Sequence, residues 1–307
     1  MSTLRVTNIE NPSTTSGGID IDTSGHVTVD GVAMPSAGPL SNRNLVINGA
    51  MQVAQRGTST TSPGYLLDRF YYQTSGATGT CSQESFTIGQ TDVPGADKYL
   101  KLDITTGDNN SGIYHRIEAK NAFCAIGKKV TLSYYAKGTS PADGLQVGIN
   151  WYDGSTSSSK ASTTVTLTSS WVKYTHTFDV PSISGLTLTN ASAYLQIGWQ
   201  QAPTDTGTAA YQLQLAQVQL EVGSVATPFE HRSYGDELLR CQRYYFKAIG
   251  STSFVLSNGI YNSFQFPVRM RVTPTVTLSG EGSTVSGTDA DGFHALRNGT
   301  NLSLIHI

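Results

Sequence analysis

Charged residues are scarce in this chain. Asp, Glu, Lys and Arg make up 14% of its 307 residues, and the formal net charge is −2, whereas charged residues are roughly a quarter of an ordinary globular protein. So little charge of either sign leaves no electrostatic footprint for nucleic acid or for an anionic membrane surface. No apolar run approaches the roughly 18–20 residues of a membrane span. The first residues also lack the pattern of a signal peptide.

Cysteine is scarce as well. Cys81, Cys124 and Cys241 are widely spaced and odd in number, and no C-x-x-C pair occurs. We therefore expect neither a disulfide framework nor a zinc site. The three thiols are expected to be small buried side chains of a protein that is made in a reducing cytoplasm.

Gly, Ser, Thr, Asn, Tyr and Val replace the missing charge, and this balance favours strands, turns and neutral polar surfaces. In residues 1–40, short apolar alternations such as Ile19/Ile21 and Val27/Val29 are separated by turn formers. Strands this short bury little in one chain, so we predict a β-rich stalk in which three copies pack around an axis. A disordered tail is the alternative. Residues 34–39 contain two prolines and a glycine, which predicts a linker.

From residue 45 to residue 230 the pattern is almost all strand. Apolar and polar residues alternate with period two in several segments, for example 99–104, 129–134, 145–151 and 194–199. The alternation changes phase within 211–222, and an extra residue at Ala216-Gln217 would restore one buried face, as in a β-bulge. Many short strands with turns between them predict a jelly-roll β-sandwich.

A helical period begins after Arg232. Ser233-x-x-Asp236 resembles a capping box, and Tyr234, Leu238, Cys241 and Tyr245 fall on one helical face. Strand character returns at 253–256, 261–267 and 275–278. The fold class that we predict is therefore mainly β, with a short β-rich stalk, a jelly-roll β-sandwich and a small α+β C-terminal domain with one helix.

The predicted division is a stalk and linker at 1–40, a jelly-roll domain at 41–231 and a tip domain at 232–301. Residues 302–307 match what the mosaic-end adapter of transposon-based sequencing libraries encodes in one reading frame. We expect these residues to be adapter-derived and the tip domain to be truncated. A genuine terminal strand is the alternative, and the nucleotide sequence at this point distinguishes the two.

Five segments of the chain match recurrent sequence motifs. Residues 42–57 are similar to a recurrent N-x-NGxMxVxQRG segment, and residues 67–70 to its DRW/DRF continuation. Residues 216–232 match a QLExGxxATxFExR ending, residues 237–245 an ELxxCQRYY helix and residues 266–275 an FPVxMRxxPT segment. These motifs occur in the right order over residues 42–275, and together they resemble those of tail-fibre proteins of tailed bacteriophages. The resemblance implies a carbohydrate-binding-module-like jelly roll on a fibre that is usually a homotrimer, with a virion location and other virion tail proteins as partners.

Two strand ends carry the side chains that bind sugars, an aromatic face flanked by amides. The candidate ligand-binding residues are Asn150, Trp151, Tyr152, Trp199, Gln200 and Gln201. Trp151 and Trp199 keep phase with aliphatic neighbours, so a core position is the alternative for both. Asn150, Tyr152 and Gln200 are predicted on the opposite, solvent-facing side. We expect Tyr114-His115-Arg116 to be sheet surface and Trp171 to pack over an end of the domain.

No catalytic or metal-binding constellation stands out. Four glutamates are isolated, namely Glu84, Glu118, Glu221 and Glu230, and neither G-x-S-x-G nor H-E-x-x-H occurs. Four histidines are too scattered to suggest a metal site, namely His115, His176, His231 and His294. No cofactor is expected. A structural calcium ion is possible, with Asp103, Asp108 and Asn109 as conceivable ligands, although a turn explains residues 107–110 as well.

The predicted function is multivalent, non-covalent adhesion to a host cell-surface carbohydrate, in which three weak sites per fibre give avidity. A purely structural fibre or decoration protein is the alternative, and a glycan-degrading tail enzyme is a further one.

Overall fold

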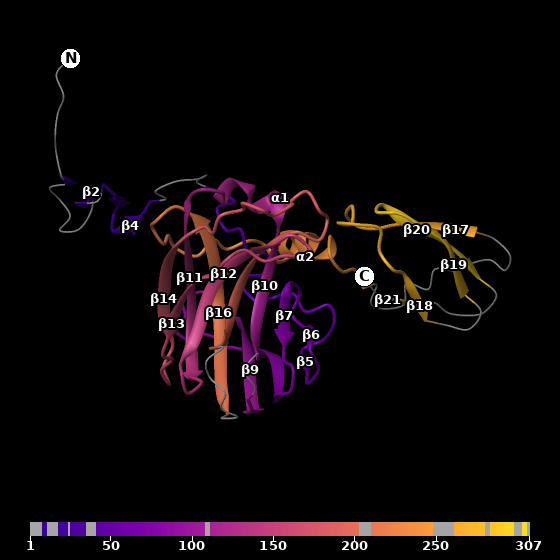
Figure 1. The fold of residues 1–307 in the computed structure, drawn as a ribbon, viewed down its shortest axis with the longest axis horizontal. Helices are drawn as coiled ribbons and strands as arrows, with labels where there is room; N and C mark the ends of the chain where they lie inside the picture. The colour runs from indigo at the N-terminus through magenta and orange to yellow at the C-terminus, as the bar shows by residue number, and fades with distance from the viewer. Residues whose placement is uncertain are drawn as a thin grey trace, which may run out of the picture.

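The computed structural model describes residues 8–10, 18–23, 25–34, 41–107, 111–202, 210–247, 261–279, 283–297 and 303–305. The elements in this part of the chain are almost all strands, arranged in five sheets (Figure 1). Two six-stranded sheets face each other and form a central sandwich. The predicted fold class, mainly β with a jelly-roll β-sandwich and one main helix, is confirmed.

A four-stranded antiparallel sheet precedes the sandwich. Its strands follow one another in sequence order: β1 (Asn8–Glu10), β2 (Gly18–Ile21), β3 (Val27–Val29) and β4 (Val32–Ala33). Asp30 and Gly31 both have positive φ, 51° and 75°, which suits the tight turn between β3 and β4. Ile19, Ile21 and Val32 are each more than a third exposed, as expected for strands that bury little within one chain.

The first sheet of the sandwich has the order β13-β12-β15-β10-β7-β6. These strands are β6 (Gly64–Tyr65), β7 (Phe70–Gln73), β10 (Gly112–Glu118), β12 (Leu145–Tyr152), β13 (Ala161–Val165) and β15 (Tyr194–Gln201). A short helix, α1 (Ala119–Ala122), and a 3₁₀ turn, η1 (Phe123–Ala125), follow β10.

The second sheet has the order β14-β11-β16-β9-β8-β5. Its strands are β5 (Ser59–Thr60), β8 (Thr78–Ser85), β9 (Lys98–Thr106), β11 (Lys129–Thr139), β14 (Val172–Asp179) and β16 (Tyr211–Val222). Successive strands cross between the two sheets several times, and all the pairings within both sheets are antiparallel.

The core lies between the two sheets. Its largest members with no exposed surface include Trp151, Trp199 and Tyr134, and the rings of Tyr134 and Trp199 meet edge to face at 5.5 Å. Cys81 and Cys241 are also buried, as predicted. Cys124 is exposed, so the prediction of three buried thiols is wrong for this residue. The reason is that Cys124 lies in η1, on a connection outside the sheets, where the strand alternation does not apply.

The β-bulge predicted at Ala216-Gln217 is present in β16. The register between β11 and β16 shifts there, and Gln217 takes a φ of 47°. Leu215 before the bulge and Val218 after it are both fully buried in the same core. The extra residue therefore puts both halves of the strand in one phase.

Gly49 fits against this bulge. The Val218 N–H donates to the Gly49 carbonyl at 2.9 Å, and a Cβ at position 49 would stand 2.1 Å from the Val218 carbonyl oxygen. The neighbouring Asn48 and Met51 have φ of 62° and 59°, so the chain turns sharply here. A side chain at position 49 would force this turn away from the strand, which gives the glycine of the N-G motif a physical reason.

The main helix, α2 (Tyr234–Gln242), begins at the predicted cap. The Ser233 hydroxyl oxygen accepts the Asp236 N–H, and it donates to the Asp236 carboxylate at 2.7 Å. The predicted buried face is correct for Cys241 and Tyr245 but wrong for Tyr234, which is 56% exposed. Glu237 is buried in its place because Arg232 and the Asn48 N–H both bind its carboxylate.

Five short strands follow the helix in two small sheets. They are β17 (Tyr261–Gln265), β18 (Thr277–Ser279), β19 (Ser283–Thr288), β20 (Gly292–Arg297) and β21 (Ser303–Ile305). Phe266, Met270 and Phe293 form a small core of their own. The predicted strand at 253–256 lies outside the described residues. β21 pairs with β18, and the adapter origin of residues 302–307 stays a prediction.

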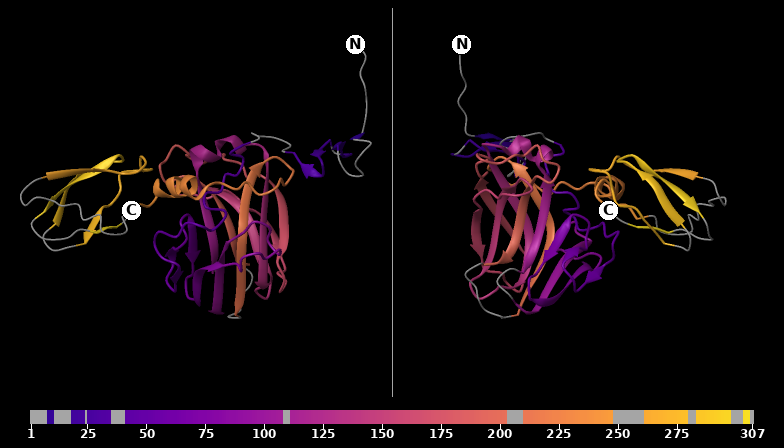
Figure 2. Two further views of the ribbon diagram at one scale, coloured as in Figure 1. Left: turned by 180° about the vertical axis from the view of Figure 1, so that it is seen from behind. Right: turned by 45° about the vertical axis from the view of Figure 1, so that its right-hand side comes forward.

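The β1–β4 sheet and the C-terminal strands lie on opposite sides of the sandwich, and helix α2 lies between the sandwich and the C-terminal strands (Figures 1 and 2). A bond from His26 to Ser224, at 3.2 Å, connects the first sheet to the sandwich. Arg243, just after α2, forms an ion pair with Glu118 of β10. The carbonyl oxygen of Arg243 accepts the Arg271 N–H at 3.0 Å. The domain boundaries themselves stay a prediction.

Candidate functional site

Three of the predicted ligand-binding residues share the outer face of the first sheet. Asn150 and Tyr152 alternate with core residues along β12, and Gln200 does the same along β15. In the register of these strands, Asn150 faces Gln196 and Tyr152 faces Tyr194. Four of these five side chains are half-buried, and Gln200 is 9% exposed. The sheet therefore gathers amides and tyrosines on one surface.

Trp151, Trp199 and Gln201 do not belong to that surface. Both tryptophans have no exposed area, and Gln201 is 1% exposed. The period of a strand sends neighbouring side chains to opposite faces, so residues beside Tyr152 and Gln200 enter the core. All three are therefore wrong as ligand-binding candidates, because a ring without an open face cannot stack on a sugar and a buried amide cannot reach one.

The prediction of a solvent-facing Gln200 is wrong, because its side chain is buried and bound to protein partners. Its amide oxygen accepts the Tyr114 hydroxyl at 2.7 Å and the Lys160 ammonium at 2.8 Å. Burial lowers the pKa of Lys160 to about 8. On the same face, Gly198 has no side chain, and the Tyr114 ring lies over it. This end of the surface is thus a closed polar network, and the more accessible groups are at the Tyr152 end.

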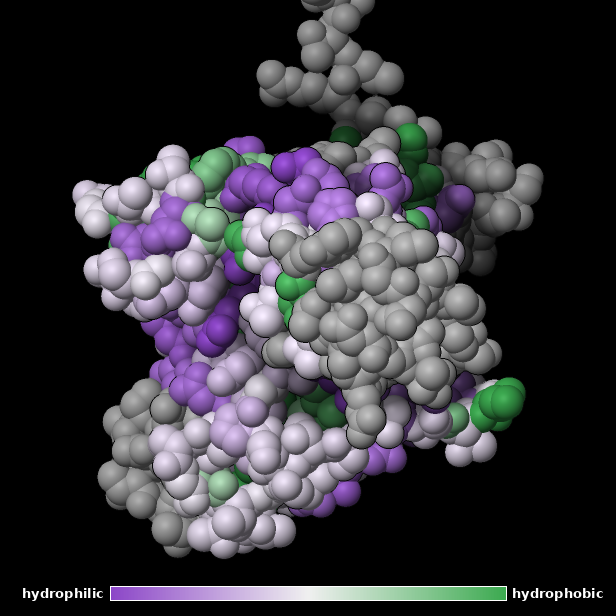
Figure 3. All heavy atoms as spheres, turned by 90° about the vertical axis from the view of Figure 1, so that its right-hand side faces the viewer, coloured by the Kyte–Doolittle hydropathy of each residue, from purple (hydrophilic) through white to green (hydrophobic). Residues whose placement is uncertain are grey.

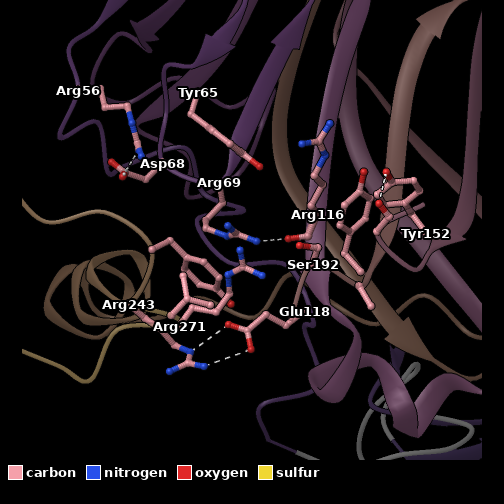
Figure 4. Close-up of a pocket in the computed structure, with 15 residues that line it drawn as sticks. Arg56, Tyr65, Asp68, Arg69, Arg116, Glu118, Tyr152, Ser192, Arg243 and Arg271 are labelled. Atoms are coloured by element: carbon pink, nitrogen blue, oxygen red, sulfur yellow. Dashed lines mark hydrogen bonds and ion pairs between the residues drawn. The ribbon is translucent and has the colours of Figure 1, made fainter. Parts of the chain in front are cut away.

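A cavity of about 600 Å³ opens at the Tyr152 end of the sheet. Arginines and tyrosines dominate its walls: Arg56, Arg69, Arg116, Arg243, Arg271, Tyr65, Tyr152, Tyr194 and Tyr244. Asp68 and Glu118 contribute two carboxylates. Seen from the side of the C-terminal strands, hydrophilic residues gather in a hollow of the surface (Figure 3). Figure 4 shows how these side chains converge from the sheet and from the region around helix α2.

Two of the arginines are held in ion pairs. Arg56 binds the buried Asp68 at 3.1 Å, and its guanidinium lies 3.6 Å from the centre of the Tyr245 ring. Burial lowers the pKa of Arg56 and raises the pKa of Asp68. Arg243 donates two hydrogen bonds to the Glu118 carboxylate, from Nε at 3.0 Å and from Nη2 at 3.2 Å. These bonds outweigh burial and lower the pKa of Glu118.

The other three arginines have no such partner. Within the described residues, no carboxylate oxygen lies within 4.0 Å of a nitrogen of Arg69, Arg116 or Arg271. The guanidinium of Arg69 lies 3.5 Å from the centre of the Tyr244 ring, and it donates to the Arg116 carbonyl oxygen. Arg271 donates to the Ala191 carbonyl oxygen. The cavity therefore combines paired and unpaired cations.

Tyrosine rings surround the remaining cation. The Arg116 guanidinium lies 4.7 Å from the centre of the Tyr71 ring and 5.0 Å from that of Tyr194. The Tyr152 and Tyr194 rings are 5.0 Å apart at an angle of 36°. Burial raises the pKa of Tyr194, so its hydroxyl stays neutral and can donate. Aromatic faces beside N–H donors are the chemistry that sugar rings and their substituents require.

The recognisable motifs have a structural role that is visible in the same region. The Asn48 side chain accepts the Val53 N–H at 2.9 Å and donates to the Val53 and Asp68 carbonyls. Gln55 Nε2 donates to the Tyr245 carbonyl at 2.8 Å. The NGxMxVxQRG, DRF and CQRYY segments thus bind one another and hold helix α2 against the sandwich.

The glutamates of the closing motif are bound in the same way. Glu230 accepts the Asn44 N–H at 3.0 Å and pairs with Arg232 at 3.1 Å. Glu221 is 2% exposed and accepts both the N–H and the hydroxyl of Thr227. Their lone pairs are therefore engaged by protein donors, and neither is poised to transfer a proton to a substrate.

One surface cluster has the residue order of a catalytic triad. Asp22 binds His26 Nδ1 at 3.0 Å, and His26 Nε2 lies 3.2 Å from the Ser224 hydroxyl. Asp22 is 54% exposed and Ser224 is also exposed. The cavity at Tyr152 does not include these residues. A cluster this open to solvent lacks the water-excluded setting of such triads.

No group of three or more His, Cys, Asp or Glu side chains that could hold a metal is found in the described part of the chain. Two of the conceivable calcium ligands, Asp108 and Asn109, lie outside that part, and Asp103 pairs with Lys101 at 3.0 Å. Tyr114 is 4% exposed and His115 is fully buried, so the prediction of sheet surface is wrong for both, while Arg116 beside them lines the cavity. Trp171 packs against Phe86 and Tyr99.

Sequence reasoning missed the arginines of the cavity. Arg56, Arg69 and Arg243 occur inside family-like motifs, and Arg116 was assigned to plain sheet surface. The position of Arg116 along its strand could have indicated the site. Arg116 lies on the same side of β10 as Tyr114, opposite Gln196 of the neighbouring strand β15. Without the strand order β12-β15-β10-β7, that signal does not connect Arg116 to Tyr152.

No protein-family model matches this chain, and no curated protein matches its sequence. Among solved structures, it is similar to the enzymatically active domain of tailspike protein 4 of bacteriophage CBA120, at 12% identity and a TM-score of 0.38. That match covers 59% of this chain but 21% of the tailspike chain.

Two further likenesses are to carbohydrate-binding modules. One is the CBM22-1 xylan-binding domain from Paenibacillus barcinonensis, at 14% identity and a TM-score of 0.34, covering 60% of this chain and 96% of that one. The other is the family 11 module from Clostridium thermocellum in complex with a β-1,3-1,4-mixed-linked tetrasaccharide, at 15% identity, a TM-score of 0.33, and coverage of 56% and 97%. Such values do not carry a functional assignment, so the function has to be inferred from the residues. Among the described residues no helix is long and apolar enough to cross a membrane.

Proposed function

We propose that this chain is a non-enzymatic, glycan-binding component of a tailed-bacteriophage tail fibre. The observation that carries the glycan-binding part is the outer face of the first sheet, where Asn150, Tyr152, Tyr194 and Gln196 lie together and lead into the cavity. This surface combines tyrosine rings with amide donors and acceptors. A pyranose offers a C–H face to the rings and hydroxyls to the amides.

The virion part of the proposal rests on other features. The motifs of residues 42–57, 216–232 and 237–245 resemble those of tail fibres, and their side chains form the bonds that join the sandwich to helix α2. The exposed Ile19, Ile21 and Val32 of the first sheet would be covered if three stalks packed together. We therefore propose a homotrimer, divided into stalk, sandwich and tip as above, that contacts other tail proteins and a host-surface carbohydrate.

We propose that binding is not followed by cleavage. A glycosidase needs two available carboxylates across a cleft, and the cavity does contain Asp68 and Glu118. The Asp68 carboxylate accepts hydrogen bonds from Gln55 and Arg56, and the Glu118 carboxylate accepts them from Arg243. Both carboxylates are therefore occupied as ion-pair and hydrogen-bond acceptors.

The Asp22–His26–Ser224 cluster has the residue types of an esterase triad, so the absence of ester hydrolysis is tested directly. The chain is incubated with p-nitrophenyl acetate, and its rate is compared with that of the Ser224→Ala variant. We expect equal rates, since the cluster joins the first sheet to the sandwich and its Asp22 and Ser224 are open to solvent. A rate that depends on Ser224 would contradict the non-enzymatic proposal.

A glycan array probed with the full chain tests the proposed function. We expect binding to a set of saccharides and its loss in Tyr152→Ala. Tyr135→Ala is the matched control, because Tyr135 is a half-buried tyrosine on β11 of the other sheet. The glycan-binding proposal is wrong if no saccharide is bound, or if both variants bind as the wild type does. The chain would then be a structural spacer of the fibre.

A further inference from the structure

The cavity beside Tyr152 carries an excess of positive charge. Five arginines and two carboxylates line it, although the whole chain has a formal net charge of −2. The excess is therefore a local property of this cavity. From its geometry we infer that the cavity binds the anionic group of an acidic saccharide, a carboxylate or a phosphate. This inference rests on the proposed glycan-binding function and specifies its substrate class.

Arg69 is the strongest single reason. It is 7% exposed, has no carboxylate within 4.0 Å in the described part of the chain, and its Nε–H finds no hydrogen-bond partner there. A buried cation without an ion partner is costly. Among the described residues its direct contacts are the Tyr244 ring and the Arg116 carbonyl oxygen, and Asp68 attracts it only from beyond ion-pair distance. An anion bound in the cavity would supply the missing opposite charge.

The backbone at Arg69 supports the same conclusion. Arg69 has a φ of 74°, in the left-handed region that a bulky side chain rarely adopts. Such strain is retained where the surrounding structure imposes it, and it is concentrated at functional sites. Here the turn between β6 and β7 directs the guanidinium towards Arg116 and the cavity (Figure 4).

Arg116 supplies the open hydrogen-bond donors. Its Nε donates to the Gln196 amide oxygen at 3.3 Å, and its two terminal nitrogens have no partner among the described residues. The Tyr71 and Tyr194 rings on either side hold the guanidinium in place. A planar guanidinium with a free edge matches the two oxygens of a carboxylate or phosphate.

The position of the cavity links the anion to a sugar. Tyr152 and Tyr194 form one wall, and they continue the sheet face that holds Asn150 and Gln196. A saccharide on that face can direct a negatively charged substituent towards Arg116. Arg271, from the segment after β17, also lines the cavity, and it donates to the Ala191 carbonyl oxygen. The C-terminal part of the chain therefore contributes to the site.

Paired probes test the charge preference by titration calorimetry with the full chain. Sialyllactose is compared with lactose, and mannose 6-phosphate with mannose, so that carboxylate and phosphate sources are separated. We expect the acidic member of at least one pair to bind at least about tenfold more tightly, because hydrogen bonds between a guanidinium and an anion are stronger than those between neutral groups. We also expect this preference to weaken as salt is added.

Arg116→Gln and Arg69→Gln are the test variants, and Arg269→Gln is the matched control. Arg269 is an exposed arginine that pairs with Asp291 outside the cavity. We expect the preference for the acidic member to fall below about threefold in both test variants and to persist in the control. A change of the same size in all three variants would contradict the inference.

Failure of this inference differs from failure of the proposed function. If the array shows Tyr152-dependent binding but the acidic and neutral members of both pairs bind equally, the anion site is refuted and glycan binding stands. If the array shows no saccharide binding at all, both are refuted. Equal binding of a single-stranded oligonucleotide and of the acidic saccharides would also refute the inference of an acidic-saccharide site. The cavity would then bind any anion, whether or not a sugar carries it.

Discussion

Acid should destabilise the protein through His115, a fully buried residue of β10. Its Nε2–H donates to the Ile47 carbonyl oxygen at 3.0 Å, and Nδ1 finds no partner among the described residues. Protonation would place a charge and an unpaired N–H in the core. Burial is the main cause that lowers the pKa of His115 to about 3, and the nearby Arg69 lowers it further.

The sign and size of the effect follow from these values. An unfolded histidine with a pKa of 6.5 takes up its proton before the folded one does, so the unfolded state gains stability as the pH falls. At pH values above the unfolded-state pKa, the contribution of the neutral His115 to the free energy of unfolding is fully present. Linkage gives a loss of about 2 kcal/mol of unfolding free energy between about pH 7.5 and about pH 5. The loss grows to about 5 kcal/mol as the pH approaches the folded pKa.

The measurement is urea unfolding, followed by tryptophan fluorescence, at several pH values for the wild type and His115→Gln. Glutamine keeps an N–H for Ile47 but does not titrate. We expect the variant to be less stable than the wild type near pH 7.5 and to lose about 2 kcal/mol less on acidification to about pH 5. The matched control is His231→Gln, since His231 is exposed. Parallel pH profiles of wild type and His115→Gln would refute the reasoning.

Three further predictions concern single positions. Gly49→Ala should unfold at clearly lower urea than the wild type, by roughly 3 kcal/mol or more, because the new Cβ meets the Val218 carbonyl at 2.1 Å; an unchanged midpoint would contradict the packing described here. Ser233→Ala should cost about 1 kcal/mol through loss of the cap to Asp236, and calorimetric melting checks this against the exposed Ser155→Ala. The Lys160 ammonium should titrate near pH 8 in an NMR experiment, since burial lowers its pKa to about 8; titration above about pH 10 would show that it is solvated.

Local sequence patterns predicted much of the fold correctly. The period-two segments became strands, the phase change in 211–222 became a bulge, and Ser233 became the cap of α2. Each of these depends on residues a few positions apart. The same logic gave the wrong result for Tyr234, where helical spacing favoured burial. The ion pair of Glu237 with Arg232 decided which side of the helix turned inward.

The candidate site was predicted only in part. Alternation along β12 and β15 correctly separated the outward Asn150 and Tyr152 from the buried Trp151 and Trp199. The outward residues were correctly placed on a sheet face, but nothing in their own segments indicated a neighbouring cavity. Tyr194, the partner of Tyr152, is recognisable only when the strand register is known.

The sequence by itself determined many of the strands, the bulge, the helix cap and the alternation of faces along β12, because these follow from backbone periodicity and local hydrogen bonding. The tertiary structure alone decided where charge accumulates. Arg69, Arg116 and Arg271 are far apart in a chain that has little net charge, and they line one cavity only because the sheet order and helix α2 bring their segments together. Convergence of this kind depends on long-range packing, which no local spacing of residues encodes.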